Sequence, residues 1–359
     1  MNMWRIICFS LMLVFIPGML SAQEYQWKAN FDYFFDNNEY KKTPFAESQT
    51  MQGIWISPLG GVTWDTLHSL YGGANLLVLP GSKDAVDKVD VTLFYQYKTP
   101  KVFFRAGSFP RKDVLYNYNN FFFTDSIANF DPLMQGVFWQ IGNNDAFFNM
   151  WMDWTGYADP TTRESFFVGL SGKASKGILF SDFQSYMYHN SNTRPATIGD
   201  MGVRENIQLQ ASLGLEYENI KGFEGLLSAG TLLGYERDRM NGDAFYKPVG
   251  FTARANAEYW GIGTQNTLYV GDPRMRLFDF YRSDLYWGTP FLRSNSYLKS
   301  EWYIRLLDSD RAKAQFNFNL HFSEGNVLLQ QMLTVSATIG NFSDQRIGKG
   351  RFPWMRIFQ

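Results

Sequence analysis

The sequence predicts an all-β protein, a transmembrane antiparallel up-and-down β-barrel of about sixteen strands, within a range of about 14–16. Three observations lead to this prediction. Apolar and polar residues alternate along many segments of roughly ten residues, aromatic residues make up 18% of the chain, and short and long connections alternate between the segments. A strand that is apolar on one face only also explains how so many aromatic residues accompany a mean hydropathy of -0.27.

The alternation is clearest in the segment 311–322. Phe316, Phe318 and Phe322 share one face, whereas Asn317 and His321 lie on the other. A period of two residues identifies a half-apolar strand with no helical component. The same pattern predicts strands at 25–35, 47–57, 66–79, 89–98, 101–107, 134–142, 145–154, 164–172, 177–189, 204–217, 225–236, 247–260, 262–271, 295–307, 311–322 and 327–339.

The lengths of the connections distinguish a membrane barrel from a soluble β-sandwich. Short links are expected at 99–100, 143–144, 173–176, 261 and 308–310, and the link at 58–65 is the least clear. Long links are expected at 36–46, 80–88, 108–133, 155–163, 190–203, 237–246 and 272–294. Short turns on one rim and long loops on the other are typical of membrane barrels, whereas a sandwich has no reason to sort its loops in this way.

The N-terminus predicts export. Arg5 precedes an apolar run at 6–16, Pro17 and Gly18 interrupt that run, and small residues follow at 20–22. This is the layout of a secretory signal peptide. We therefore expect a signal peptide at 1–22 and one barrel domain at 23–359, with an inserted loop at 108–133 and a short C-terminal tail at 340–359. The expected location is the outer membrane of a Gram-negative cell, among outer-membrane lipid and lipopolysaccharide.

The composition limits the partners and the kinds of chemistry that can be expected of this protein. A formal net charge of -1 gives no reason to expect a nucleic-acid partner. The single cysteine, Cys8, lies in the predicted signal peptide, so thiolate chemistry and a disulfide framework are not expected. The sequence contains no recognisable metal-ligand spacing or phosphate loop, and we expect no metal and no cofactor.

In architecture, the chain resembles outer-membrane porins across nearly its whole mature length. General porins fold a loop into the lumen at the position of the 108–133 connection, where it narrows the pore. The resemblance implies passive diffusion of small hydrophilic solutes, and a homo-oligomer by analogy. The expected constriction residues are Arg111, Lys112, Asp113, Asp125 and Asp131, and the expected luminal charges are Arg105, Arg254, Glu258, Lys299, Glu301 and Arg305. The alternatives are an external loop that packs on itself and a lumen filled by ion pairs.

A short motif points to a different class of function. His189-Asn190-Ser191-Asn192 is similar to the H-x-S-N pattern of outer-membrane phospholipase A and lipid A deacylase. The resemblance implies Ser191 as nucleophile, His189 as base and Glu205 as orienting acid, with calcium under the phospholipase reading only. Those enzymes are smaller barrels, and Thr193 stands where the phospholipase has glycine. A solvated loop tip is the simpler reading, and a structural barrel subunit of a surface complex is a third possibility.

Overall fold

The computed structural model describes residues 23–41, 43–143, 145–196, 202–218, 222–240, 242, 244–309 and 311–341. The expected signal peptide at 1–22 lies outside these residues. So does the expected C-terminal tail, apart from Gly340 and Asn341.

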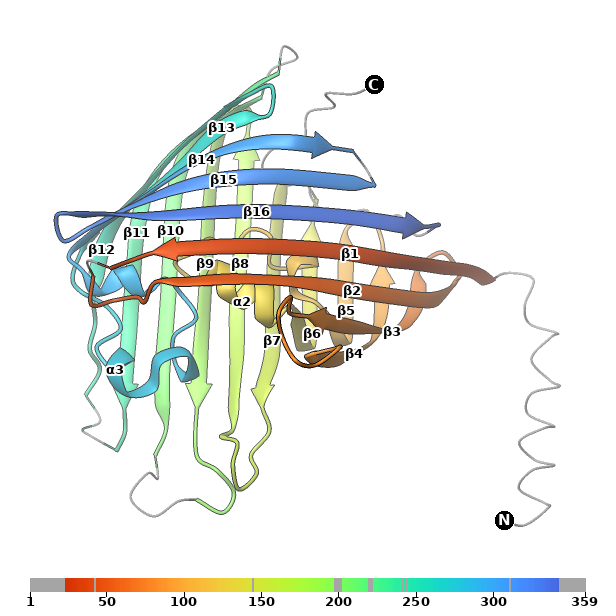
Figure 1. Cartoon of the computed structure of the whole chain (residues 1–359), viewed down its shortest axis with the longest axis horizontal. Helices are drawn as coiled ribbons and strands as arrows, with labels where there is room; N and C mark the ends of the chain where they lie inside the picture. The colour runs from red at the N-terminus through yellow and green to blue at the C-terminus, as the bar shows by residue number, and fades with distance from the viewer. Residues whose placement is uncertain are drawn as a thin grey trace.

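Sixteen strands form a closed antiparallel barrel in which every strand pairs with its neighbours in sequence and β1 pairs with β16 (Figure 1). This confirms the predicted fold. The strands are β1 (Gln23–Glu39), β2 (Gln49–Trp64), β3 (His68–Val78), β4 (Lys88–Lys98), β5 (Val102–Pro110), β6 (Leu133–Gly142), β7 (Ala146–Gly156), β8 (Ser165–Lys176), β9 (Leu179–Asn190), β10 (Arg204–Glu218), β11 (Phe223–Asp238), β12 (Val249–Tyr259), β13 (Ile262–Gly271), β14 (Ser296–Asp308), β15 (Ala312–Ser323) and β16 (Asn326–Gly340).

The second strand differs from its predicted bounds of 47–57. β2 continues through Pro58 to Trp64, and the turn to β3 comes at 65–67. The register between β2 and β3 skips from the pair Ile56–Leu76 to the pair Leu59–Gly73. A proline is tolerated at such an irregularity, because the local ladder is already interrupted there. The residues that resemble a turn in the sequence therefore lie within a strand.

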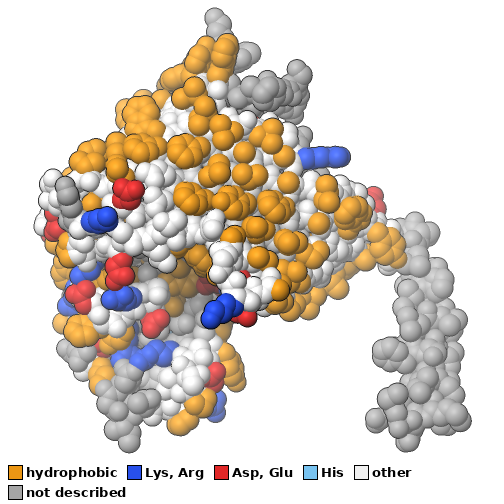
Figure 2. Space-filling view, viewed as in Figure 1, with side chains coloured by type: hydrophobic (Ala, Val, Ile, Leu, Met, Phe, Trp, Pro, Cys, Tyr) orange, Lys and Arg blue, Asp and Glu red, His pale blue; other side chains and the backbone are white. Residues whose placement is uncertain are grey.

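The outer surface of the barrel is apolar. Leu93, Leu213 and Trp302 project outward with 56%, 71% and 52% of their surface exposed. Figure 2 shows hydrophobic side chains across the strands that face the viewer, while the charged side chains gather near α3 (Phe278–Tyr281). Such a band suits contact with lipid tails. No helix among the described residues is long and apolar enough to cross a membrane.

Two long connections fold into the lumen. The first, 111–132, contains η2 (Arg111–Asp113) and α2 (Asp125–Phe130). The second, 272–295, contains α3, η3 (Arg282–Asp284) and η4 (Pro290–Arg293). They hydrogen-bond to each other, since Thr124 N donates to Trp287 O and Thr289 N donates to Asn120 O, both at 2.9 Å.

A hydrophobic core therefore lies inside the barrel as well as a lipid-facing surface outside it. The loops contribute Phe121, Phe122 and Trp287, which pack against inward-facing aromatic side chains of the strands. Those strand residues include Phe138, Trp151, Phe167, Tyr186 and Tyr269. This core fills the part of the lumen beside these strands, and the remaining cavities lie elsewhere along the inner wall of the barrel.

Candidate functional site

Arg111 anchors the first luminal loop at its base. Its Nη2 lies 2.5 Å from Asp153 Oδ2 on β7 and 2.9 Å from Leu133 O, and its Nη1 donates to Asp131 O. The guanidinium also lies 4.8 Å from the ring of Trp287. Since the two side chains are only 7% and 2% exposed, this is a buried ion pair that joins both loops to the wall.

Three side chains of the barrel wall position α2. Trp55 Nε1 donates to Asn129 O at 2.7 Å, and Lys88 Nζ donates to Phe130 O at 3.2 Å. On the other side, Lys299 Nζ lies 3.6 Å from Asp125 Oδ2. The helix is only six residues long, and these contacts fix it beside β1 and β2, as Figure 1 shows.

Two cavities lie on either side of the segment 120–127. The first, of about 480 Å³, is lined by residues of β1 to β6, of β16 and of the first loop. The second, of about 380 Å³, is lined by the end of β1, the start of β2, the link between them, both luminal loops and single residues of β14, β15 and β16. They share Asn120, Thr124, Asp125 and Ile127. β1 runs from the short-turn rim toward the long-loop rim. Lys28, near the start of β1, lines the first cavity, and Tyr40, just after its end, lines the second. The two cavities therefore follow one another along this wall.

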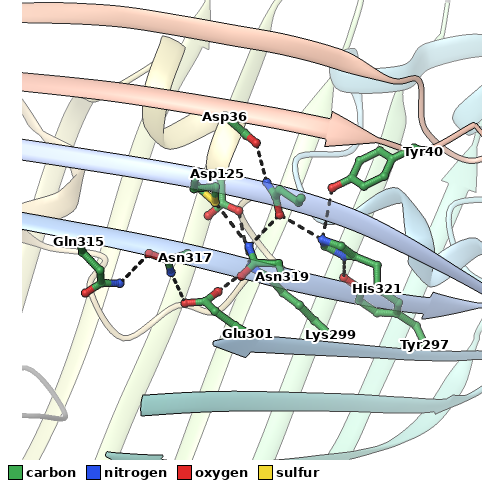
Figure 3. Close-up of polar contacts among 12 residues, drawn as sticks. Asp36, Tyr40, Asp125, Tyr297, Lys299, Glu301, Gln315, Asn317, Asn319 and His321 are labelled. Atoms are coloured by element: carbon green, nitrogen blue, oxygen red, sulfur yellow. Dashed lines mark hydrogen bonds and ion pairs between the residues drawn. The ribbon is translucent and has the colours of Figure 1, made fainter. Parts of the chain in front are cut away.

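A polar network lies where the two cavities meet (Figure 3). Lys299 Nζ lies 2.9 Å from Glu301 Oε2 as well as near Asp125, and Glu301 accepts from Asn317 Nδ2 at 2.7 Å. Two carboxylates thus flank one ammonium group. We call Asp125, Lys299 and Glu301 the inter-cavity triad. It brings a net negative charge to this point of the lumen.

A second chain of contacts continues from the triad toward the long-loop rim. Gln330 Nε2 donates to Asp36 Oδ1 at 2.9 Å, and His321 Nε2 lies 3.0 Å from Gln330 Oε1. The other ring nitrogen of His321 lies 2.8 Å from Tyr297 Oη, and Tyr40 Oη lies 3.2 Å from Nε2. Both imidazole nitrogens therefore take part in hydrogen bonds within the wall.

The structure separates the predicted site residues into two groups. Arg111, Lys112, Asp125 and Lys299 line a cavity, and Glu301 supports Lys299. The rest make ion pairs or polar contacts away from the cavities. These are Arg105 with Asp113 at 2.9 Å, Arg254 with Asp182 at 2.8 Å, Arg305 with Glu258 at 2.6 Å, and Asp131 with Lys88 at 4.0 Å.

Sequence reasoning missed most of the first cavity. Phe34, Trp55 and Asn129 line it without belonging to a motif, whereas Tyr116 lies in the aromatic part of the 108–133 connection that was expected to narrow the pore. Burial raises the pKa of Tyr116 to about 12, so its hydroxyl stays protonated at neutral pH. The second luminal loop was expected only as a long link. Its aromatic residues were the signal that it would be buried, because exposed loops rarely need so many.

In the H-x-S-N motif, His189 lies on the outer face of β9 and Ser191 follows the strand, whereas Asn190 points inward and its Nδ2 donates to Asp284 O at 3.1 Å. Strand pairing places Glu205 directly opposite His189. However, the Glu205 carboxylate is held by Arg237, whose Nε lies at 2.7 Å, and by Arg239, whose Nη2 lies at 3.0 Å. The His189 ring stacks on Phe166 with centroids 4.7 Å apart. Among the described residues, no hydrogen bond joins His189 to Ser191 or Glu205.

Solved structures share the fold at low sequence identity. A loop-deletion variant of OmpT, an outer membrane protein of Vibrio cholerae, gives a TM-score of 0.54 at 12% identity, over 89% of this chain and 100% of that chain. An anion-selective porin from Comamonas acidovorans gives 0.53 at 10% identity, over 88% and 100% of the two chains. The expected architectural resemblance to outer-membrane porins is thereby confirmed, as a matter of fold alone.

The sequence itself matches one family model. The family described as lipid A 3'-O-deacylase-type covers residues 20–334. No curated protein matches the chain.

Proposed function

The chain belongs to the lipid A 3'-O-deacylase-type family, and for this member we propose a narrow outer-membrane channel that passes small hydrophilic solutes along the β1–β16 wall. The observation that carries the proposal is the pair of cavities that meet at Asp125 in the lumen. The inter-cavity triad is the constriction of this channel. Porin-type structures of similar fold are consistent with the proposal.

The charges of the triad give the channel a preference for cations. Asp125 and Glu301 outnumber Lys299, and charged groups lining a narrow pore attract the opposite ion. Asp125→Asn should therefore reduce the preference for K⁺ over Cl⁻, and Lys299→Met should increase it. The measurement is the reversal potential across a planar bilayer in a KCl gradient. Asp84→Asn, in the exposed connection between β3 and β4, is the control and should leave the potential unchanged.

Two results would contradict the channel. One is an absence of conductance steps from the purified protein at any voltage. The other is an equal shift of the reversal potential in Asp84→Asn and Asp125→Asn, because the selectivity would then reside outside the lumen.

Family membership favours a second candidate function, hydrolysis of outer-leaflet lipid at Ser191 and His189. For this chemistry, Glu205 would have to leave Arg237 and Arg239 and turn to His189. The test is release of fatty acid from lipid A or phospholipid by the purified protein and by Ser191→Ala. Thr193→Ala serves as a neighbouring hydroxyl control. If Ser191→Ala releases as much fatty acid as the unmodified chain, this candidate is excluded.

A further inference from the structure

Three neighbouring strands, β12, β13 and β14, carry polar side chains on the outer wall of the barrel. Asn266 lies in the middle of β13, which has 10 residues, the length that crosses the bilayer core. It shares its side of the strand with the exposed Ile262 and Val270, whereas Tyr269 points inward and is buried. Ser300 lies directly beside it on β14. An amide group therefore faces outward at a depth where lipid tails offer no hydrogen bond.

Asn266 is only partly satisfied by its own chain. Its Nδ2 donates to Ala255 O and to Thr264 Oγ1, both at 3.1 Å. Thr264 lies on the same outward side of β13, and both side chains are partly exposed. Within the described part of the chain, no group donates to Asn266 Oδ1, which the protein does not enclose, and none accepts the hydroxyl hydrogen of Thr264. The outer wall thus presents a free acceptor beside a free donor.

Other hydroxyl groups on the outer wall are satisfied within the barrel. Ser108, Ser185 and Thr231 donate to backbone carbonyls of the neighbouring strand at 2.8, 3.0 and 3.2 Å. Such internal hydrogen bonds reduce the cost of a polar side chain that faces lipid. Thr264 instead accepts from Asn266, so its own hydrogen and the amide oxygen remain for a partner outside the chain.

Small side chains surround these groups and let another protein surface approach them. Ala255 and Ala257 lie directly opposite Asn266 and Thr264 on β12. Ala253 continues the same outward side of that strand. Small residues permit close contact within a membrane, where packing and hydrogen bonds drive association because lipid tails are as apolar as the protein surface.

The free donor and the free acceptor are complementary to each other, so a second copy of the same surface satisfies both. Under a two-fold axis, the Thr264 hydroxyl of each copy donates to Asn266 Oδ1 of the other, and no hydrogen bond within either chain has to break. Lipid head groups do not reach this position, because they lie at the ends of the strand and not at its middle.

We propose that the outer wall around Asn266 and Thr264 is the interface of a two-fold symmetric dimer of this chain, with Ala255 and Ala257 providing the close approach. The proposal assigns a surface to the homo-oligomer that was expected by analogy alone. It does not depend on the proposed channel, because each copy keeps its own lumen.

Two conservative variants remove the donor and the acceptor separately. Thr264→Val and Asn266→Leu should each raise the dissociation constant of the dimer by about 10- to 100-fold, because two-fold symmetry makes each substitution remove two hydrogen bonds. Sedimentation equilibrium of the purified chain in density-matched detergent measures this constant. Ser185→Ala, on the outer side of β9, is the control and should leave the constant unchanged. Circular dichroism should show an intact barrel in all three variants.

A steric variant and a cross-link locate the surface. Ala257→Trp should leave the protein monomeric, whereas Ala106→Trp, on the outer side of β5 across the barrel, should not. In membranes of cells that produce the protein, a short bifunctional thiol reagent should join Ala257→Cys into dimers and leave Ala106→Cys monomeric. A protein that is monomeric at all concentrations, a dimer that survives Ala257→Trp, or a trimeric mass overturns the proposal.

Discussion

The ion pair between Arg111 and Asp153 should be the contact on which the placement of the first loop most depends. Asp153→Asn removes one charge and leaves the guanidinium buried, since the two side chains are only 7% and 2% exposed. Removing one partner of a buried pair costs about 3–5 kcal/mol, because the remaining charge has lost both water and its counter-ion. We therefore expect Asp153→Asn to lower the free energy of unfolding by about that amount.

The double variant Arg111→Met with Asp153→Asn should cost less than the single one. In both variants, an asparagine at that position still accepts the hydrogen bond that Gln135 N donates to Asp153 Oδ1 at 2.8 Å. The double variant removes both charges, but it leaves Asp131 O and Leu133 O without the donors that Arg111 supplies. The loss of those hydrogen bonds should cost about 1–3 kcal/mol. Asp32→Asn is the matched control, because Asp32 on β1 pairs with Lys112 of the same loop, and this pair is 56% (Lys112) and 29% (Asp32) exposed and should contribute at most about 1 kcal/mol.

The assay is guanidinium unfolding of the protein in detergent, followed by tryptophan fluorescence, with the midpoint and slope fitted for each variant. From most to least stable, we expect the unmodified chain, Asp32→Asn, the double variant and Asp153→Asn. A double variant as unstable as Asp153→Asn would refute the reasoning, because the cost would then not arise from an uncompensated charge. Asp153→Asn should also raise the single-channel conductance, since the released loop leaves more of the lumen open.

Two further predictions concern the same loops. Gly288→Ala should lower stability by about 1–3 kcal/mol in the same unfolding assay, because the added Cβ would lie 2.0 Å from Phe121 O. Gly60→Ala, with no heavy atom within 4 Å of the added carbon, should change it by no more than about 0.5 kcal/mol. Burial acts to raise the pKa of Asp113, but the charges of Arg105, Lys28 and Lys112 outweigh it and hold the pKa below its ordinary value. The ionised Asp113 carboxylate therefore stabilises the fold fully at a pH above the ordinary carboxyl pKa, and this contribution is lost as the pH falls through the lowered pKa of the folded state. In Asp113→Asn, the free energy of unfolding should consequently fall less steeply as the solution is acidified. Equal acid sensitivity of both proteins would contradict this assignment.

The strands could be predicted from the sequence because each carries its own local period. Alternation in 311–322 identifies β15 with no knowledge of its neighbours, and the same holds for the other strands apart from the second half of β2. The wrong end predicted for β2 has a local cause as well. Pro58, Gly60 and Gly61 have the composition of a turn, whereas the irregular pairing of β2 with β3 keeps them in the strand.

The site could be predicted only in part, because a loop has no period that reports where it folds. Arg111, Lys112 and Asp125 were found since they belong to the loop that resembles the constriction loop of porins. The pairing of Arg111 with Asp153 and of Asp125 with Lys299 was not predicted, because the register of distant strands brings these partners together. Tyr116 and Asn129 lie in that same loop, but the sequence gives no signal that Tyr116 Oη and Asn129 Nδ2 would be buried without a hydrogen-bond partner.

The location of the proposed passage follows from how the chain uses its aromatic residues. Along β6 to β9, inward aromatic side chains such as Trp151 and Phe167 draw the loops onto that wall and exclude water from it. Along β1, β2 and β16, the side chains beside the cavity include the small polar Asn30, Ser57 and Thr334, whereas the aromatic Phe34 and Trp55 of the same wall are covered by α2. The space that remains therefore lies beside the small polar side chains that no loop residue covers. Replacing small polar residues on that wall with aromatic ones should close the passage without altering the barrel.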